Sequence, residues 1–300
     1  MDVDGEEFPD IIAQSLPEVF WLEATDSSLE TWTKKEIGTI PATSHVNSQG
    51  FEKLQMVPGG KEEFVVAGDG DIYLFEIPEN SETDKWKVTM IAENTSDEGI
   101  GYGDIDGDGD VDIAAGRRPD GEDEPLVLVW YENPSNGLPS GGSKKWSSTV
   151  VGKSNHPIDR IEVADLDGDG KADIVMTEER YPGLEPDGSL FWYAQPDDSK
   201  AEWTQNEVVK QYSMNNLDVA DMDEDGDMDL ITAEHKGLYL KTQIWINDGS
   251  GNFTETVIDT GKESHLGTQL HDMDNDGDLD LISSGWDNYR FMHLWLNPEK

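Results

Sequence analysis

The sequence predicts an all-β fold assembled from repeated units of four short antiparallel strands. Three observations predict it. An acidic stretch of nine residues begins at Asp104, Asp165, Asp221 and Asp272, at intervals of 61, 56 and 51 residues. Short apolar segments flank every copy, and tryptophans recur at fixed places between the copies. A repeat of this length is typical of a propeller, a solenoid or an array.

The strands of one unit can be followed around the copy that begins at Asp165. "IEVA" precedes the acidic stretch and "IVMT" follows it, and "SLFWYA" and "EWTQNEVV" come next. Each segment is too short for a stable helix and is rich in β-branched and aromatic residues, so each is expected to be a strand. Turns that contain Pro, Gly or Asn separate the later segments. The unit is therefore strand, acidic loop, strand, turn, strand, turn, strand.

Nine of the ten tryptophans fall into two positions of the repeat. Five lie in the third strand and four open the fourth, where Phe253 continues the series. A large aromatic side chain at one structural position is expected to fill the interface between neighbouring sheets. The residues are Trp21, Trp130, Trp192, Trp245 and Trp295 in the third strand, and Trp32, Trp86, Trp146 and Trp203 in the fourth.

Six second strands can be counted, near Ile11, Phe64, Ile113, Ile174, Leu230 and Leu281. The approximate repeats are 1–41, 42–92, 93–151, 152–208, 209–258 and 259–300 of one domain. The first repeat lacks its first strand and the last lacks its fourth. Six blades are expected if the units form a propeller, and seven if upstream sequence is missing.

Composition limits the classes of partner. The 300 residues include 65 acids and 21 bases, which gives a net charge of -44. Nucleic acid and anionic membranes are therefore not expected to bind. The chain has no cysteine, so it forms neither disulfides nor thiolate metal sites. Its apolar runs are far shorter than the roughly 18 residues of a membrane span, and its N-terminus does not resemble a signal peptide.

The acidic loop has the composition of a calcium site. Positions 1, 3, 5 and 9 are Asp in all four copies, and position 6 is always Gly. Calcium prefers oxygen ligands. Position 7 is Lys171 in one copy, and a lysine side chain cannot bind a cation, so position 7 is expected to offer its backbone carbonyl. Position 12 is never the Glu of an EF-hand, and strands replace the flanking helices. About four calcium sites are expected, from Asp104, Asp106, Asp108, Asp110, Asp112, Asp165, Asp167, Asp169, Lys171, Asp173, Asp221, Asp223, Asp225, Asp227, Asp229, Asp272, Asp274, Asp276, Asp278 and Asp280.

Other interpretations of these loops remain open. A metal-free acidic turn is the main alternative, and magnesium demands stricter geometry than calcium. Catalytic carboxylates are disfavoured by four near-identical copies. In the degenerate stretch "DVDGEEFPD", metal binding by Asp2, Asp4, Glu6 and Asp10 stays open, since these acids are retained but Gly is missing at position 6. The segment around "AGDGD" shows no matching loop, and no metal is predicted there.

The strand, "DxDxDGxxD", strand unit resembles the FG-GAP/VCBS repeat family, which includes the calcium-binding blades of integrin α-like propellers. The resemblance covers nearly the whole chain. It implies a β-propeller of four-stranded antiparallel blades, with calcium loops joining first and second strands on one face. It also implies an extracellular or cell-surface location and possible membership of a larger multidomain chain. Relatives act in adhesion, in lectin-like carbohydrate binding, or as modules of enzymes that degrade polysaccharides.

Basic and aromatic residues gather in the loops expected on the opposite face. All five arginines fall there, and on so acidic a chain they suggest a ligand with anionic or polar groups. Pairing with local acids such as Glu178 and Glu179 is the alternative. The candidate ligand-binding residues are His45, Arg117, Arg118, His156, Arg160, Arg180, His235, His265, Trp286, Tyr289 and Arg290.

Two functional hypotheses follow. The first is a non-catalytic, calcium-stabilised extracellular propeller that binds carbohydrate or another cell-surface ligand, with an anionic glycan as candidate. The second is an enzyme, a polysaccharide lyase or a sugar dehydratase. Its base would be His156, His265, Tyr181 or Tyr289, and the arginines would stabilise an enolate. No nucleophile motif is present, and the spacing of these residues fixes no active-site arrangement.

Overall fold

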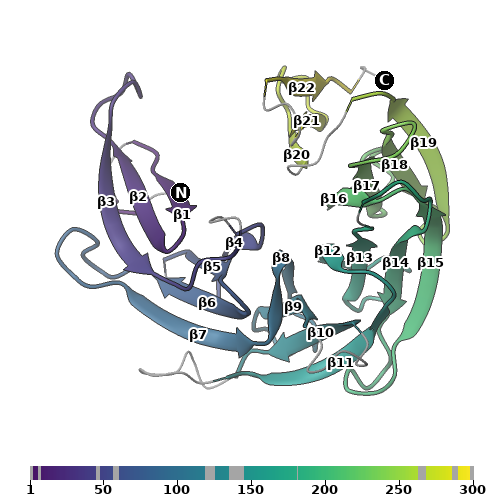
Figure 1. Cartoon of the computed structure of the whole chain (residues 1–300), viewed down its shortest axis with the longest axis horizontal. Helices are drawn as coiled ribbons and strands as arrows, with labels where there is room; N and C mark the ends of the chain where they lie inside the picture. Colours follow the sequence, from purple (N-terminus) through teal and green to yellow (C-terminus); the bar gives the residue numbers. More distant parts are fainter. Residues whose placement is uncertain are drawn as a thin grey trace. The chain divides into compact units, whose positions relative to one another are not determined.

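The computed structural model describes residues 3–5, 8–44, 48–56, 61–118, 126–134, 145–180, 182–262, 268–285 and 290–297 (Figure 1). These residues form twenty-two strands and no helix. The strands make six antiparallel sheets, and in each sheet the strands lie side by side in chain order. None of the described residues forms a helix that is long and apolar enough to cross a membrane.

The strand bounds follow the six repeats. The first two sheets comprise β1 (Ile11–Ser15), β2 (Glu18–Ala24) and β3 (Trp32–Thr39), then β4 (Phe51–Leu54), β5 (Glu63–Ala67), β6 (Asp71–Glu76) and β7 (Lys87–Glu93). The next two comprise β8 (Thr95–Gly103), β9 (Asp112–Arg117), β10 (Leu126–Glu132) and β11 (Ser147–Ser154), then β12 (Ile158–Ala164), β13 (Asp173–Glu178), β14 (Gly188–Ala194) and β15 (Thr204–Gln211). The last two comprise β16 (Met214–Ala220), β17 (Asp229–Glu234), β18 (Thr242–Asn247) and β19 (Phe253–Asp259), then β20 (Thr268–His271), β21 (Asp280–Ser284) and β22 (Met292–Trp295).

These sheets confirm the predicted fold class, an all-β protein built from the antiparallel blades of a β-propeller. Four sheets have four strands, and among the described residues the first and last have three. The first sheet lacks the first strand of the repeat and the last lacks the fourth, as the sequence predicts. The second strands β5, β13 and β17 are buried along their whole length, because both faces of these strands are covered.

The chain divides into two compact units. One contains residues Met1–Ile100 and Tyr131–Ser148, and the other contains Gly101–Trp130 and Thr149–Lys300. The third sheet contributes strands to both units. In the first unit, Trp21 and Phe75 are fully buried, and the Phe64 and Phe75 rings stack with centroids 4.8 Å apart. Burial of these aromatic faces stabilises the first two blades.

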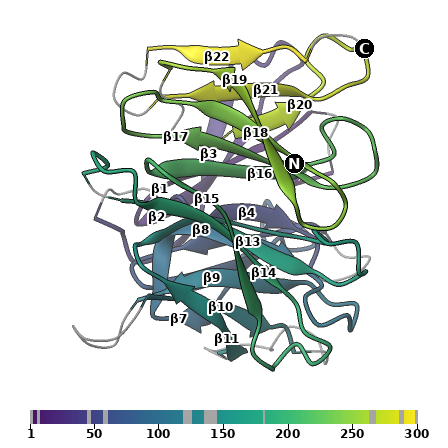
Figure 2. The ribbon, with the colours of Figure 1, turned by 90° about the vertical axis from the view of Figure 1, so that its right-hand side faces the viewer.

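In the second unit the sheets stack one beside the next, from β12–β15 to β20–β22 (Figure 2). The first strand β12 packs against β9 and against β16, and β16 packs against β20. Trp130, Trp192 and Trp245 are buried between these sheets, which confirms the packing role predicted for the third-strand tryptophans. An acidic loop follows each first strand here, and the start of that strand lies at the opposite end of its blade.

Candidate functional site

One hydrogen bond recurs in all six blades at the start of the second strand. The backbone N–H at position 2 of the loop donates to the carboxylate at position 9. The pairs are Val3 with Asp10 (2.8 Å), Met56 with Glu63 (2.9 Å), Ile105 with Asp112 (3.1 Å), Leu166 with Asp173 (3.0 Å), Met222 with Asp229 (2.8 Å) and Met273 with Asp280 (2.8 Å). We call this contact the position-9 clamp. All six carboxylates are buried.

The second oxygen of the position-9 carboxylate also accepts a hydrogen bond in several blades. In three blades of the second unit it accepts a backbone N–H at the end of the third strand or just after it, from Gln195, Asn247 and Asn297, at 2.8–2.9 Å. In the first blade the indole Nε1 of Trp21 donates to Asp10 instead, at 2.8 Å. In these four blades position 9 therefore ties three segments together, a structural role that the sequence analysis did not assign to it.

The clamp also reveals a loop that the sequence analysis missed. Met56 and Glu63 are seven residues apart, as in every other blade, so residues 55–63 are the loop of the second blade. The stretch "AGDGD" is instead the turn between β5 and β6. Positions 1, 3 and 5 of the loop at 55–63 are Gln, Val and Gly, so it lacks the carboxylates of a cation site.

In the four complete loops the carboxylates converge. Ligand oxygens of positions 1, 3 and 5 lie within 4.8 Å of one another in the loops at 104, 221 and 272, and those of positions 1, 3 and 9 do so in the loop at 165. The Gly at position 6 donates its N–H to the position-1 carboxylate at 2.9–3.2 Å and has a positive φ of 85–104°. Glycine adopts this φ without strain. Such clustered hard oxygens fit a hard divalent cation.

The electrostatics of the loops favour a bound cation. Burial raises the pKa of the Asp173 carboxyl to about 6 and also raises that of Asp229. Desolvation and the neighbouring Asp276 raise the pKa of Asp278 to about 6. Each rise reflects the cost of an uncompensated negative charge, because the charged form is disfavoured by burial and by like charges. A cation in the loop would remove part of this cost.

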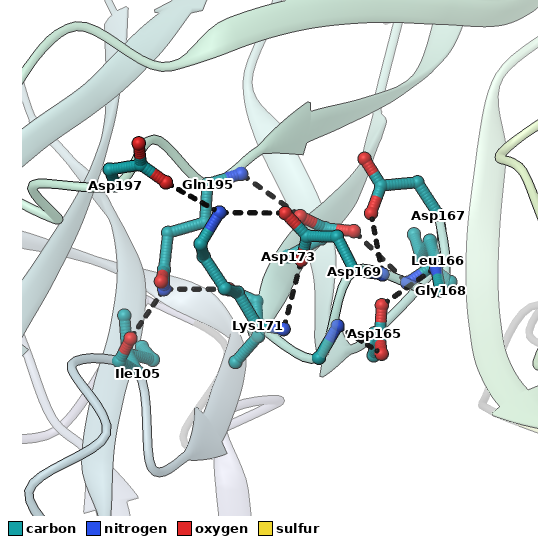
Figure 3. Close-up of polar contacts among 12 residues, drawn as sticks. Ile105, Asp165, Leu166, Asp167, Gly168, Asp169, Lys171, Asp173, Gln195 and Asp197 are labelled. Carbon is teal, nitrogen blue, oxygen red and sulfur yellow. Dashed lines mark hydrogen bonds and ion pairs between the residues drawn. The ribbon is translucent and has the colours of Figure 1, made fainter.

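Lys171 distinguishes the loop at 165 from the others. Its ammonium lies 2.7 Å from a carboxylate oxygen of Asp169 and 3.1 Å from one of Asp197 (Figure 3). The hydrogen bond from Lys171 lowers the pKa of Asp169. A side chain at position 7 therefore engages the position-5 carboxylate in this loop, and a metal ion would have to compete with it there.

Side-chain amides connect successive loops. Nε2 of Gln195 donates to the carbonyl of Ile105, at position 2 of the preceding loop, and to that of Ala172 (Figure 3). Nδ2 of Asn247 makes the same pair of bonds, to Leu166 at 2.9 Å and to Met228 at 3.0 Å. The acidic loops at 104, 165 and 221 are thus linked in series. In the sequence, the signal for this link is the Gln or Asn at the end of the third strand or just after it.

In the first unit, Lys61 makes the equivalent link between neighbouring blades. Its ammonium donates to the backbone carbonyls of Val3 (3.0 Å), Pro78 (3.1 Å) and Glu79 (3.3 Å). Val3 is position 2 of the first loop, the same position that Gln195 and Asn247 contact in their preceding loops. The Lys61 ammonium therefore connects the first two blades, and the loop of the second blade lacks the aspartates of the complete loops.

Replacing Lys61 with methionine should destabilise the protein by about 1.5–3 kcal/mol, because three carbonyl oxygens lose a charged donor while the apolar stem is kept. The loss should be the same in calcium and in EDTA. Lys53→Met is the matched control, since the Lys53 ammonium makes only an exposed ion pair with Glu62 at 3.0 Å, worth about 0–1 kcal/mol. Urea denaturation measures both variants. Equal losses in the two variants would contradict the bridging role.

A second group of polar side chains gathers at the other end of these blades. It comprises His156, Asp159, Arg160, Arg180 and Asp187, and we call it the polar cluster. A β-bulge between Ile158 and Ile161 interrupts the β12–β13 ladder, so that the N–H of Arg160 donates to the Thr177 hydroxyl at 3.2 Å. Bulges redirect side chains and are frequent beside functional sites.

The arginines of the polar cluster are paired with aspartates. The Arg160 guanidinium contacts the buried Asp159 carboxylate at 2.5 Å. Nε of Arg180 donates to both oxygens of Asp187 at 3.1 Å, and Nε2 of His156 lies 3.8 Å from the same carboxylate. The cluster thus offers fixed donors and acceptors with little net charge. Asp159 and Asp187 are cluster members that the sequence analysis did not select.

The remaining sequence candidates fall into three groups. His235 is buried, and its backbone N–H donates to Ser213, whose hydroxyl accepts the N–H of Arg180. It therefore lies beneath the polar cluster. Arg117 ends β9, Arg118 follows it, and Arg290 is exposed before β22, so these three lie in the third and sixth blades rather than in the loops that carry the polar cluster. The candidates outside the described residues are His45, Tyr181, His265, Trp286 and Tyr289.

The acids at the end of the second strand bind backbone rather than arginine. Glu178 is fully buried and accepts the Ser154 hydroxyl at 2.7 Å and the backbone N–H groups of Asn155 and Ser189 at 2.8 and 3.1 Å. Glu234 holds the equivalent place in the next blade and accepts the N–H of Lys241 at 3.0 Å. These carboxylates fix the loops that carry the polar cluster.

Asp159 should make stability depend on pH. Burial raises the pKa of its carboxyl to about 7, against the opposing effect of Arg160 and with a smaller rise from Glu179. The folded chain therefore binds a proton that the unfolded chain releases above about pH 4, so this contribution to stability is lost as pH rises through about 7. In EDTA, Asp159→Asn should lose less stability than the wild type between pH 5 and 7.5. Parallel curves from urea denaturation would contradict the assignment.

Comparisons with known proteins agree with this architecture. Residues 60–115 match the FG-GAP-like repeat family. No curated protein matches the sequence. The fold is similar to that of an Agrocybe aegerita lectin, described by its specific recognition of non-reducing terminal N-acetylglucosamine. The TM-score is 0.52 and the identity 14%, over 95% of this chain and 79% of the lectin. The chain therefore contains a match to an FG-GAP-like repeat within a fold of six β-propeller blades, which supports the family resemblance that the sequence suggests.

Proposed function

We propose that this chain is a calcium-stabilised β-propeller module that binds carbohydrate outside the cell or at its surface. The observation that carries the binding function is the polar cluster, where paired donors and acceptors from two loops and a bulge lie together at the end of the blades opposite the acidic loops. The lectin with a similar fold supports carbohydrate as the ligand class.

Calcium is the cation that best suits the four complete loops. Side-chain oxygens of positions 1, 3 and 5 would hold it, together with the position-7 carbonyl and, in the loop at 165, Asp173. Calcium accepts six to eight oxygen ligands in flexible geometry, whereas magnesium demands a near-ideal octahedron. Extracellular calcium reaches the millimolar concentrations that weak loops of this kind need. The ion would neutralise clustered carboxylates and fix each loop to its blade.

The polar cluster is suited to sugar hydroxyls. Each hydroxyl donates and accepts, and the Arg180–Asp187 pair offers both functions, with the Nε–H of Arg180 shared between the two oxygens of Asp187. Arg160 is mostly committed to Asp159, with its side chain only 15% exposed. Because both arginines have acidic partners, hydrogen bonding contributes more to recognition than net charge. Adhesion to a cell-surface glycan would use the same contacts.

A glycan array that carries neutral and acidic terminal sugars tests this proposal in the presence of calcium. Wild-type protein should bind at least one class of glycan, and Arg180→Ala should weaken that binding about tenfold or more. Arg290→Ala is the matched control, because Arg290 is exposed and lies outside the polar cluster. Absence of glycan binding by folded, calcium-loaded protein would contradict the proposed function.

A further inference from the structure

An exposed aromatic loop borders the polar cluster. Residues 235–241 connect β17 to β18, and Tyr239 within them is 57% exposed. Its ring meets that of Tyr212 edge to face, with centroids 6.5 Å apart. Leu238 beside it is 77% exposed. Tyrosine is enriched at binding surfaces, and here the Tyr212–Tyr239 pair lies beside the exposed Leu238.

The loop holds Tyr239 in a fixed position. The backbone carbonyl of Tyr239 accepts the N–H of Gly261 at 2.7 Å. Glu234 and Lys241 close the base of the loop through two hydrogen bonds, at 2.8 and 3.0 Å. Leu240 has a φ of +47°, a conformation that a leucine adopts only when its surroundings impose it. The ring is therefore presented by an ordered scaffold, which reduces the entropy lost when a ligand binds.

The loop is also continuous with the polar cluster. A methyl group placed on Gly183, in the loop that carries Arg180 and Asp187, would lie 2.7 Å from Cβ of Lys236. A side chain at Gly237 would collide with the Tyr212 ring, so the loop packs directly onto Tyr212. Tyr212 in turn precedes Ser213, which accepts the N–H of Arg180. The two loops from neighbouring blades thus form one surface.

We infer that Tyr239 is the stacking platform of this surface and that the surface takes a neutral pyranose, an inference that rests on the proposed carbohydrate-binding function. The apolar face of the sugar lies against the Tyr239 ring, and its hydroxyls reach the Arg180–Asp187 pair. An acidic sugar is disfavoured, because Asp187 and the net charge of -44 oppose it. The pattern of one aromatic face beside fixed polar groups is typical of sites for amphipathic ligands.

Binding of neutral and acidic monosaccharide-terminated glycans by three variants tests the inference. Tyr239→Ala should weaken binding of a neutral glycan about tenfold, which corresponds to 1.4 kcal/mol. Tyr239→Phe should remain within about threefold of the wild type, because the ring is kept. Tyr102→Ala is the control, since Tyr102 is an exposed tyrosine (39%) at the acidic-loop end of its blade. Thermal melting checks that each variant is folded.

The outcomes separate the inference from the function on which it rests. Neutral-glycan binding that is unchanged in Tyr239→Ala overturns the platform but leaves the proposed function intact. Binding of acidic glycans alone overturns the ligand class. A folded wild-type protein that binds no glycan overturns both. Loss of binding in Tyr239→Ala with retention in Tyr239→Phe supports the inference.

Discussion

Asp229→Ala should lower the free energy of unfolding by about 2–6 kcal/mol, in calcium and in EDTA alike. Asp229 is fully buried, and its two oxygens accept the backbone N–H groups of Met222 and Asn247, each at 2.8 Å. Alanine leaves both donors buried without a partner, at a cost of about 1–3 kcal/mol each. That loss is a large share of the 5–15 kcal/mol typical of a folded protein.

Two further variants make the Asp229 prediction specific. Asp229→Asn keeps the shape and one acceptor oxygen, so its loss should be smaller. Asp225→Ala removes an exposed carboxylate at position 5 of the same loop, and its effect should disappear when calcium is removed. Urea denaturation with and without EDTA measures all three. If Asp229→Ala loses stability only in calcium, position 9 acts as a metal ligand alone and the clamp has no independent role.

Removing calcium should lower the melting temperature of the wild type more than any other change in solution conditions. A loop filled at about 100 times its dissociation constant contributes about 2.7 kcal/mol, since the ion binds only the folded chain. Asp169→Ala should reduce the response to EDTA, because it disables one of four loops. Differential scanning calorimetry measures the shift in each protein.

Ion selectivity provides the control for this prediction. EGTA with excess magnesium should leave the melting temperature as low as EDTA does, because the loops suit calcium better than magnesium. Lys171→Gln should raise the calcium response of its loop, since the lysine ammonium no longer competes for Asp169. A melting curve that is unchanged by chelation would show that the loops are metal-free acidic turns.

The blade architecture could be predicted from sequence because its signals are local and repeated. Strand segments such as Ile174–Thr177 are short, apolar and bounded by turn residues, and the repeats show the same segment six times. The acidic loops carry their signature within nine residues. Gly170 and its counterparts at position 6 mark the sharp turn. Tryptophans at one position of each repeat indicate sheet packing before any contact is known.

Features that depend on contacts between distant segments could not be predicted. Position 9 was expected to be a ligand, but its role as a clamp depends on N–H groups seven and about twenty residues away. The loop at 55–63 has no aspartate and shares with the other loops only its length and an acid at position 9, Glu63, so a search for aspartates does not find it. Position 4 has a positive φ in every complete loop, including Glu224 at +60°, although its residue type varies.

The candidate ligand site was predicted only in part. Counting arginines and histidines selected His156 and Arg180, which share the carboxylate of Asp187, and Arg160, which pairs with the adjacent Asp159. It did not select their aspartate partners, because chain order does not show which acid faces which base. Tyr239 was also missed, since its exposure depends on a loop conformation that cannot be predicted from the local sequence "HKGLYLK".

Direct counting of bound calcium tests the central claim of a calcium-stabilised propeller. Isothermal titration of calcium-free protein should give about four ions per chain, with about three for Asp169→Ala. The loops at residues 2–10 and 55–63 should contribute none, because the first lacks the position-6 glycine and the second lacks the carboxylates. A wild-type chain that binds no calcium at millimolar concentration, while remaining folded, would contradict the account.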